Sequence, residues 1–178
     1  MTRTLLLLPL LLLTACDGQG RPENNDTDGP VEQASPLEQA AIDAGVIPDI
    51  RNVSLSGAFE RRSDLGTDRF CAVGNDERGY QIGMLAVFGP DSKCEALGSA
   101  ERNGEDIQII LNSEQRCSFT AKFDGVALQF PGDLPESCTS YCTPRASLNG
   151  VNFFLVGEGD AVARSTRGRE IVSLCPGG

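Results

Sequence analysis

Apolar and polar residues alternate along much of this chain, and this period of two constrains the fold more than any other feature of the sequence. Successive side chains of a β-strand point to opposite faces, so each alternating segment is predicted to be a half-buried strand. Two segments show the pattern clearly, with Val53, Leu55, Gly57 and Phe59 in one, and Tyr80, Ile82, Met84, Ala86 and Phe88 in the other. Further predicted strands are residues 69–73, 93–102, 106–111, 116–124, 126–130, 146–156 and 170–175.

The connections between these segments are short. Asn103-Gly104 and Asp124-Gly125 predict tight hairpin turns, because both central positions of a type I′ turn require positive φ. About eight short antiparallel strands without alternating long helices are typical of a small closed barrel or a sandwich. We favour the barrel: a mainly β fold, in which a small antiparallel meander of about eight strands closes on itself and one short helix precedes it.

That short helix is predicted by a capping signal. Ser35 can cap it, Pro36 suits its first position, and Glu38 follows the cap by three residues as in a capping box. Gly45 can end the helix in a left-handed conformation, and Pro48 prevents its continuation. We expect its apolar stripe to pack at the edge of the main core, and a partner-binding helix is the alternative. The stripe comprises Leu37, Ala40, Ala41 and Ala44.

The N-terminus carries a targeting signal. Arg3 precedes a short leucine-rich segment, which ends in Leu13-Thr14-Ala15-Cys16. This run resembles a bacterial lipobox, which implies cleavage between Ala15 and Cys16 and attachment of diacylglycerol to the Cys16 sulfur. An ordinary signal peptide with Cys16 as an incidental thiol is the alternative. The apolar segment is too short to span a bilayer, which requires about 20 residues.

The resemblance implies a lipoprotein anchored in the cell envelope and facing the periplasm. Asp17, directly after the lipidated cysteine, is similar to an inner-membrane retention signal, which slightly favours the inner membrane over the outer one. Residues 1–15 are then the signal peptide, residues 16–35 the lipidated cysteine and a flexible acidic tether, and residues 36–178 a disulfide-containing barrel domain. Within the tether, residues 24–29 only weakly match a calcium loop, because Ser35 occupies the position of the expected bidentate glutamate.

Six of the seven cysteines remain after Cys16, and export would place them in an oxidising compartment. Three disulfides are therefore expected. Consecutive antiparallel strands begin at alternating ends of a barrel, so four of the cysteines should gather at one rim, with partners that the sequence leaves unassigned. Cys71 and Cys175 would then join an early strand to the last one. The four rim cysteines are Cys94, Cys117, Cys138 and Cys142.

The composition argues against several kinds of site. The chain has no histidine, so Ser-His, Cys-His and His-metal chemistry have no base or ligand. A zinc site is disfavoured because Cys138 and Cys142 form a single short pair, and no metal or cofactor is expected. The only lysines, Lys93 and Lys122, do not lie in a Ser-x-x-Lys arrangement. A pair of carboxylates could still hydrolyse glycosides, although no pair stands out.

The formal net charge is −10, which disfavours nucleic acid as a partner, because phosphate binding requires a basic surface. Anionic lipid headgroups are also a poor match, so contact with a membrane would depend on the acyl chains. A basic envelope protein is the complementary partner. The local basic residues Arg61, Arg62, Arg167 and Arg169 are interpreted as solvated charges rather than anion sites.

A lipid-anchored, acidic, disulfide-bonded antiparallel barrel resembles the membrane-bound inhibitors of c-type lysozyme in architecture and charge. Ser56-Gly57 is similar to part of the inhibitory loop of that family. The tyrosine expected after this pair is absent, so no inhibitory residue is transferred to this chain.

These observations favour a non-catalytic binding or interaction module that engages a protein or a small ligand at a barrel rim. Its membrane attachment would be through acyl chains on Cys16. An inhibitor of a cell-wall hydrolase such as lysozyme is the first alternative. A carboxylate-dependent hydrolase is the second.

Overall fold

The structure is a computed structural model that describes residues 35–47, 49, 52–112 and 117–176. The chain divides into Met1–Gln33 and Ala34–Gly178, and all elements below belong to the second unit. The strands are β1 (Gly57–Ser63), β2 (Gly66–Asn75), β3 (Gly79–Val87), β4 (Lys93–Asn103), β5 (Asp106–Leu111), β6 (Cys117–Phe123), β7 (Ala127–Gln129) and β8 (Asn152–Glu158). The helices are α1 (Pro36–Asp43), the 3₁₀ helix η2 (Glu136–Tyr141) and α2 (Asp160–Ala163).

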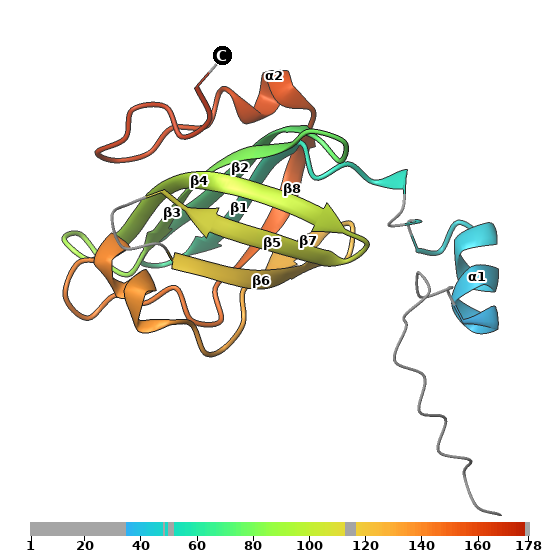
Figure 1. Ribbon diagram of the computed structural model, residues 1–178, viewed down its shortest axis with the longest axis horizontal. Coiled ribbons are helices and arrows are strands. Elements are labelled where there is room, and N and C mark those ends of the chain that lie inside the picture. Colours follow the sequence, from blue (N-terminus) through green and yellow to red (C-terminus); the bar gives the residue numbers. More distant parts are fainter. Residues whose placement is uncertain (1–34, 48, 50–51, 113–116, 177–178) are drawn as a thin grey trace, which may run out of the picture. The chain divides into compact units, whose positions relative to one another are not determined.

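The strands form one closed antiparallel barrel, in which each strand pairs with the next and β8 pairs with β1 (Figure 1). The predicted meander barrel is therefore confirmed, and the sandwich is wrong. β1 and β8 both begin later than predicted. Leu55 and Leu148 account for this difference, because they fill the core from segments that precede the strands. Burial of alternate side chains does not by itself require a paired strand.

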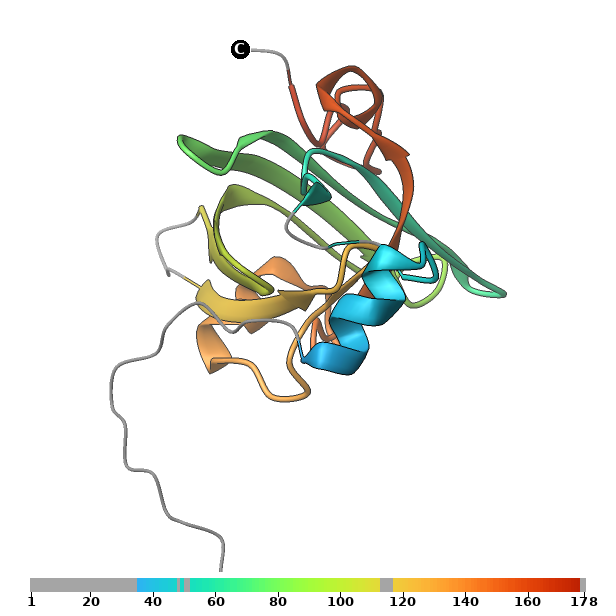
Figure 2. The same cartoon turned by 90° about the vertical axis from the view of Figure 1, so that its right-hand side faces the viewer.

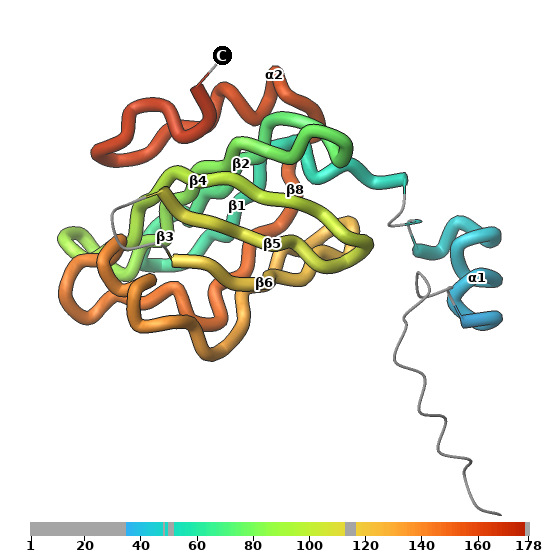
Figure 3. The backbone as a smooth tube through the Cα atoms, in the orientation of Figure 1, coloured from blue at the N-terminus to red at the C-terminus, as the bar shows by residue number. Residues whose placement is uncertain are grey.

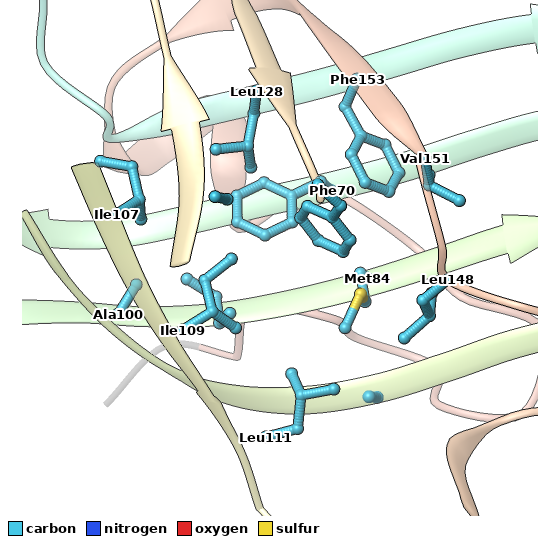
Figure 4. Packing of buried hydrophobic residues seen from close by; sticks show 14 of the residues in the cluster. Phe70, Met84, Ala100, Ile107, Ile109, Leu111, Leu128, Leu148, Val151 and Phe153 are labelled. Carbon is cyan, nitrogen blue, oxygen red and sulfur yellow. The ribbon is translucent and has the colours of Figure 1, made fainter. Parts of the chain in front are cut away.

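Side chains from all around the barrel fill its interior. Figure 4 shows Phe70, Met84, Ile109 and Phe153 pointing toward one another between the strands. The ring of Phe70 lies 5.5 Å from that of Phe59 and 5.6 Å from that of Phe153 between centroids. Ring contacts of this kind are typical of a packed core.

Both predicted hairpin turns form, but each is displaced by one residue. Asn103 pairs with Asp106, so the two central residues are Gly104 and Glu105. Gly104 has a φ of 63°, whereas Glu105 is not among the residues with positive φ. Glycine in the first central position alone is the pattern of a type II′ turn rather than a type I′ turn. Gly125, with a φ of 90°, holds the same first position in the second turn.

Helix α1 begins and ends as predicted. The Ser35 hydroxyl accepts a hydrogen bond from the Glu38 N–H, and the Glu38 carboxylate accepts one from the Ser35 N–H, both at 3.2 Å. Gly45 follows the helix with a φ of 67°. The expected packing of the helix against the core is wrong, because none of its residues is buried and Leu37 is 82% exposed. Alanines make up most of its stripe and offer little apolar area.

No helix in the described part of the chain has the length and apolar character needed to cross a membrane.

The predicted strand at residues 170–175 does not form. β8 already pairs with β1, so the barrel has no open edge there for a further strand. Residues 164–176 instead follow α2 as irregular chain over the outer side of the barrel (Figure 2). They enclose a second apolar cluster consisting of Cys71, Val73, Leu85, Val87, Ala163, Leu174 and Cys175. We call residues 160–176 the C-terminal strap.

Three disulfides link the six cysteines. Cys71 and Cys175 are bonded, as predicted, but the bond ties the strap to β2 instead of joining two strands. The other four cysteines gather at one rim, which confirms the second expectation. Their pairing, which the sequence left open, is Cys94 with Cys142 and Cys117 with Cys138.

Candidate binding site at the barrel rim

A cavity of about 290 Å³ lies at the barrel rim that carries the four cysteines. The start of β4, the end of η2 with the residues after it, and the C-terminal strap contribute its walls. The lining residues are Lys93, Glu95, Ser140, Tyr141, Cys142, Thr143, Glu170 and Ile171.

The wall after η2 is fastened to the start of β4 by covalent and hydrogen bonds. Cys94 and Cys142 form both a disulfide and an isolated β-bridge. Beside them, the Thr143 N–H donates to the Lys93 carbonyl at 2.8 Å, and the Lys93 N–H donates to the Thr143 hydroxyl at 2.9 Å. These bonds hold the two segments in a defined register.

Lys93 occupies the centre of the charged group in the cavity. Its ammonium donates to Glu95 at 2.7 Å and contacts Glu170 at 3.1 Å. Burial acts to lower the pKa of Lys93, but the hydrogen bonds to the two carboxylates outweigh it and raise the pKa. Lys93 is therefore held as an ammonium ion and not as a free amine that could act as a nucleophile.

Glu95 is a nearly fully enclosed charge, with a side chain that is only 3% exposed. Its carboxylate accepts backbone N–H groups from three consecutive strap residues, Arg169, Glu170 and Ile171. Burial acts to raise the pKa of Glu95, but these bonds and Lys93 outweigh it and lower the pKa. The close fit requires a glycine at 168, because a Cβ there would overlap Glu95 Oε1.

Tyr141 contributes a hydroxyl that is buried and has no hydrogen-bond partner among the described residues. Its side chain packs against the barrel core, and the residue lines the cavity. An unpaired buried hydroxyl costs free energy, and this one can donate one hydrogen bond and also accept.

The chemistry of the cavity follows from these contacts. Lys93 and Glu95 neutralise each other, and Glu170, which is 80% exposed, adds one negative charge that faces solvent. A general acid or base requires a pKa near the operating pH, and both shifts move away from neutrality. The arrangement can hold the strap against β4, and it can bind a cationic or hydroxyl-bearing group.

A second polar contact lies at the opposite rim, where the sequence singled out Ser56-Gly57. Ser56 is buried, and its hydroxyl donates to the Asp160 carboxylate, which also accepts the Gly74 N–H at 3.3 Å. The hydrogen bond from Ser56 is the main cause that lowers the pKa of Asp160. Ser56, directly before β1, is thus bonded to α2 and buried, so it does not belong to an exposed loop.

The arginines noted in the sequence are engaged within the protein. Arg61 binds the buried Asp68 at 2.6 Å, and Arg62 contacts Glu60 at 3.2 Å. Arg169 donates to the carbonyls of Gly89 and Pro90, and Arg167 donates to the carbonyl of Arg164. Arg61 and Arg169 are therefore held by internal contacts and are not simply solvated, whereas Arg62 is 82% exposed.

Several sequence predictions fall outside the described residues. They concern the cleavage site at Ala15 and Cys16, the retention signal at Asp17, the tether and the weak calcium motif. Within the described residues, no group of three or more His, Cys, Asp or Glu side chains could hold a metal ion.

Sequence reasoning found only part of this site. It noted Lys93 and the cysteine rim but missed Glu95, Tyr141 and Glu170. The spacing of Lys93 and Glu95 was an available signal, because residues i and i+2 of a strand share a face. Glu170 had no local signal, since its position depends on the path of the strap.

Comparison with protein-family models, with curated protein sequences and with solved structures finds no match for this chain.

Proposed function

We propose that this protein is a lipid-anchored envelope lipoprotein that acts as a non-catalytic binding or interaction module facing the periplasm. The lipobox-like run Leu13-Thr14-Ala15-Cys16 supports the anchor. The three disulfides support an oxidising compartment, where such bonds persist.

The non-catalytic role rests on one observation, the mutual neutralisation of Lys93 and Glu95 in the rim cavity. Their pKa values are shifted in the directions that keep both groups charged, so neither exchanges a proton readily near neutral pH. The packed barrel interior supports a binding site at the rim or on the outer surface, because side chains fill the inside of the barrel.

The partner that fits best is a basic protein of the envelope. The chain carries a formal charge of −10, and Glu170 exposes a carboxylate beside the rim cavity. Complementary charge of this kind accelerates association and weakens with added salt.

Intact-mass spectrometry of the membrane-extracted protein tests the anchor. We expect a mass that begins at Cys16 and includes acyl groups. The Cys16→Ser variant is the matched control and should lack both the acyl mass and the membrane attachment. An unmodified Cys16 in the native protein would contradict the lipoprotein assignment.

The second candidate, an inhibitor of a cell-wall hydrolase, is favoured by the acidic charge and the small barrel architecture. A lytic assay with c-type lysozyme separates the two. Salt-sensitive binding without slower lysis supports the interaction module, and slower lysis supports the inhibitor. Glycoside turnover that disappears when one Asp or Glu is neutralised would instead establish a hydrolase.

A further inference from the structure

Strand β6 pairs with β5 along nearly its whole length, but it pairs with β7 only at its C-terminal end. It pairs with β5 from Cys117 to Lys122. With β7 it makes only the pairs Lys122–Gln129 and Phe123–Leu128. In Figure 3 the tube of β6 lies along β5, and most of its opposite side has no neighbouring strand. The region in question is residues 118–121, which we call the β6 edge.

The direction of each backbone group on β6 follows from one hydrogen bond. The Phe123 N–H donates to the Glu105 carbonyl at 2.8 Å, across the β5 side. Hydrogen-bonded pairs alternate along an antiparallel ladder, so Phe119 and Ala121 also bond toward β5. The N–H and C=O groups of Ser118 and Thr120 must therefore point to the opposite side, along the β6 edge.

The reason that β7 does not cover this edge is visible in the sequence. If the pairing of Lys122 with Gln129 continued, Thr120 would lie opposite Pro131, which has no N–H to donate. The Pro131 carbonyl instead accepts the Gly150 N–H at 2.8 Å, so the chain turns away from β6.

Four backbone groups are left at the edge. Ser118 and Thr120 are both exposed, and among the described residues no turn or loop backbone group bonds to their N–H or C=O groups, which point away from β5. Their side chains are already engaged across the outer face. The Ser118 hydroxyl accepts from the Gln108 amide at 2.9 Å, and the Thr120 hydroxyl donates to Gln108 at 3.0 Å.

We propose that the β6 edge binds an extended segment of a partner protein by strand addition. Two unpaired N–H and two unpaired C=O groups at positions i and i+2 match the groups that a β-strand presents along one side. The net charge of −10 favours a segment that carries lysine or arginine. This inference rests on the proposed function as an interaction module and specifies how the partner is held.

A titration followed by amide resonances tests the proposal. The probe is a synthetic hexapeptide, Lys-Val-Thr-Val-Thr-Lys, acetylated and amidated, added to the ¹⁵N-labelled and fully oxidised protein. We expect rapid hydrogen exchange at the amides of Ser118 and Thr120 before addition. On addition these two amides should shift and become protected, while those of Phe119 and Ala121 change little.

Two variants of one residue make the result specific. Thr120→Pro removes the N–H at the edge and leaves the β5 bonds of Phe119 and Ala121 in place, so the fold should persist. We expect it to weaken peptide binding about tenfold, the loss of roughly one hydrogen bond. Thr120→Val retains the N–H and should bind the peptide as the native protein does.

Three outcomes would overturn the proposal: protected amides at Ser118 and Thr120 in the free protein, peptide shifts confined to other residues or absent, or unchanged binding by Thr120→Pro. None of them bears on the acyl group at Cys16 or on turnover. The proposed function would therefore stand if strand addition failed.

Discussion

Glu95 shows how one side chain can position a long segment. It lies on β4, yet it binds three consecutive backbone N–H groups of the strap, more than 70 residues further along the chain. Lys93 neutralises it on the other side. The shape of the rim cavity therefore depends on this single carboxylate.

Glu95→Gln should reduce the free energy of unfolding by about 2 kcal/mol, because it replaces charge-assisted hydrogen bonds and leaves Lys93 without its closest partner. Urea denaturation of the oxidised protein measures the loss. Glu170→Gln is the control and should change stability by less than about 0.5 kcal/mol, since this side chain is exposed. Equal effects of the two substitutions would contradict the importance of Glu95.

The pH dependence of stability should show the contribution of the Glu95 carboxylate. The folded-state pKa of Glu95 is lowered, so its contribution is present above the unfolded value of about 4.3 and is lost as the pH falls through the folded value. Lys93 has a raised pKa, and its contribution is lost only as the pH rises above about 10.4 through the folded value. We expect the stability difference between the native protein and Glu95→Gln to narrow on acidification below about pH 4. A constant difference down to about pH 2 would argue against the lowered pKa.

At the scale of elements, the C-terminal strap behaves as an addition to a barrel that is already closed. Its contacts with the barrel include the Cys71–Cys175 disulfide, the bonds to Glu95 and the packing of Leu174. Leu174 approaches so closely that a Cβ at Gly83 would overlap its carbonyl oxygen. The strap and the outer face of β2 to β4 therefore have complementary surfaces.

Replacing both Cys71 and Cys175 by alanine should loosen the strap and leave the barrel folded. We expect a loss of about 2–4 kcal/mol, because the bond closes a loop with a sequence separation of 104. Limited proteolysis under native conditions should then cleave within residues 164–176.

The matched control replaces Cys117 and Cys138, which should leave the strap resistant to the protease. Cleavage of the strap in the control variant, or none in the variant without Cys71 and Cys175, would contradict this account.

At the scale of the whole molecule, stability comes from the packed barrel interior. Phenylalanines from β1, β2, β6 and β8 occupy its centre. The interior is continuous with Leu148 and Val151, which precede β8 (Figure 4). Loss of one central ring should therefore lower the stability of the whole barrel.

Phe70→Ala should lower the free energy of unfolding by about 3–5 kcal/mol, the usual cost of a cavity left by a buried phenylalanine. Phe154→Ala is the control, because Phe154 is 42% exposed on β8 and its loss should cost about 1 kcal/mol or less. Urea denaturation monitored by far-UV circular dichroism measures both. Similar losses would mean that the interior is less tightly packed than described.

Local chemistry explains which features could be predicted from the sequence. The capping box at Ser35 and the turn glycine at 104 depend on neighbours within a few residues, so their sequence patterns are specific. The Cys71–Cys175 pairing was expected only as the pair that remained once the other four cysteines were placed at one rim, and the final strand expected to carry Cys175 was wrong. The approximate positions of the strands and the rim of four cysteines were accessible in the same way.

The sequence by itself determined the β-rich class, the approximate strands and the cysteine rim, because alternation and turn preferences act over short distances. Tertiary structure decided the closure of β1 with β8, the path of the strap and the meeting of Lys93 with Glu170. It also left the β6 edge uncovered, where Pro131 ends the pairing with β7. These features depend on contacts between residues that are distant in sequence. Such contacts form only when the whole barrel has folded and brought the residues together.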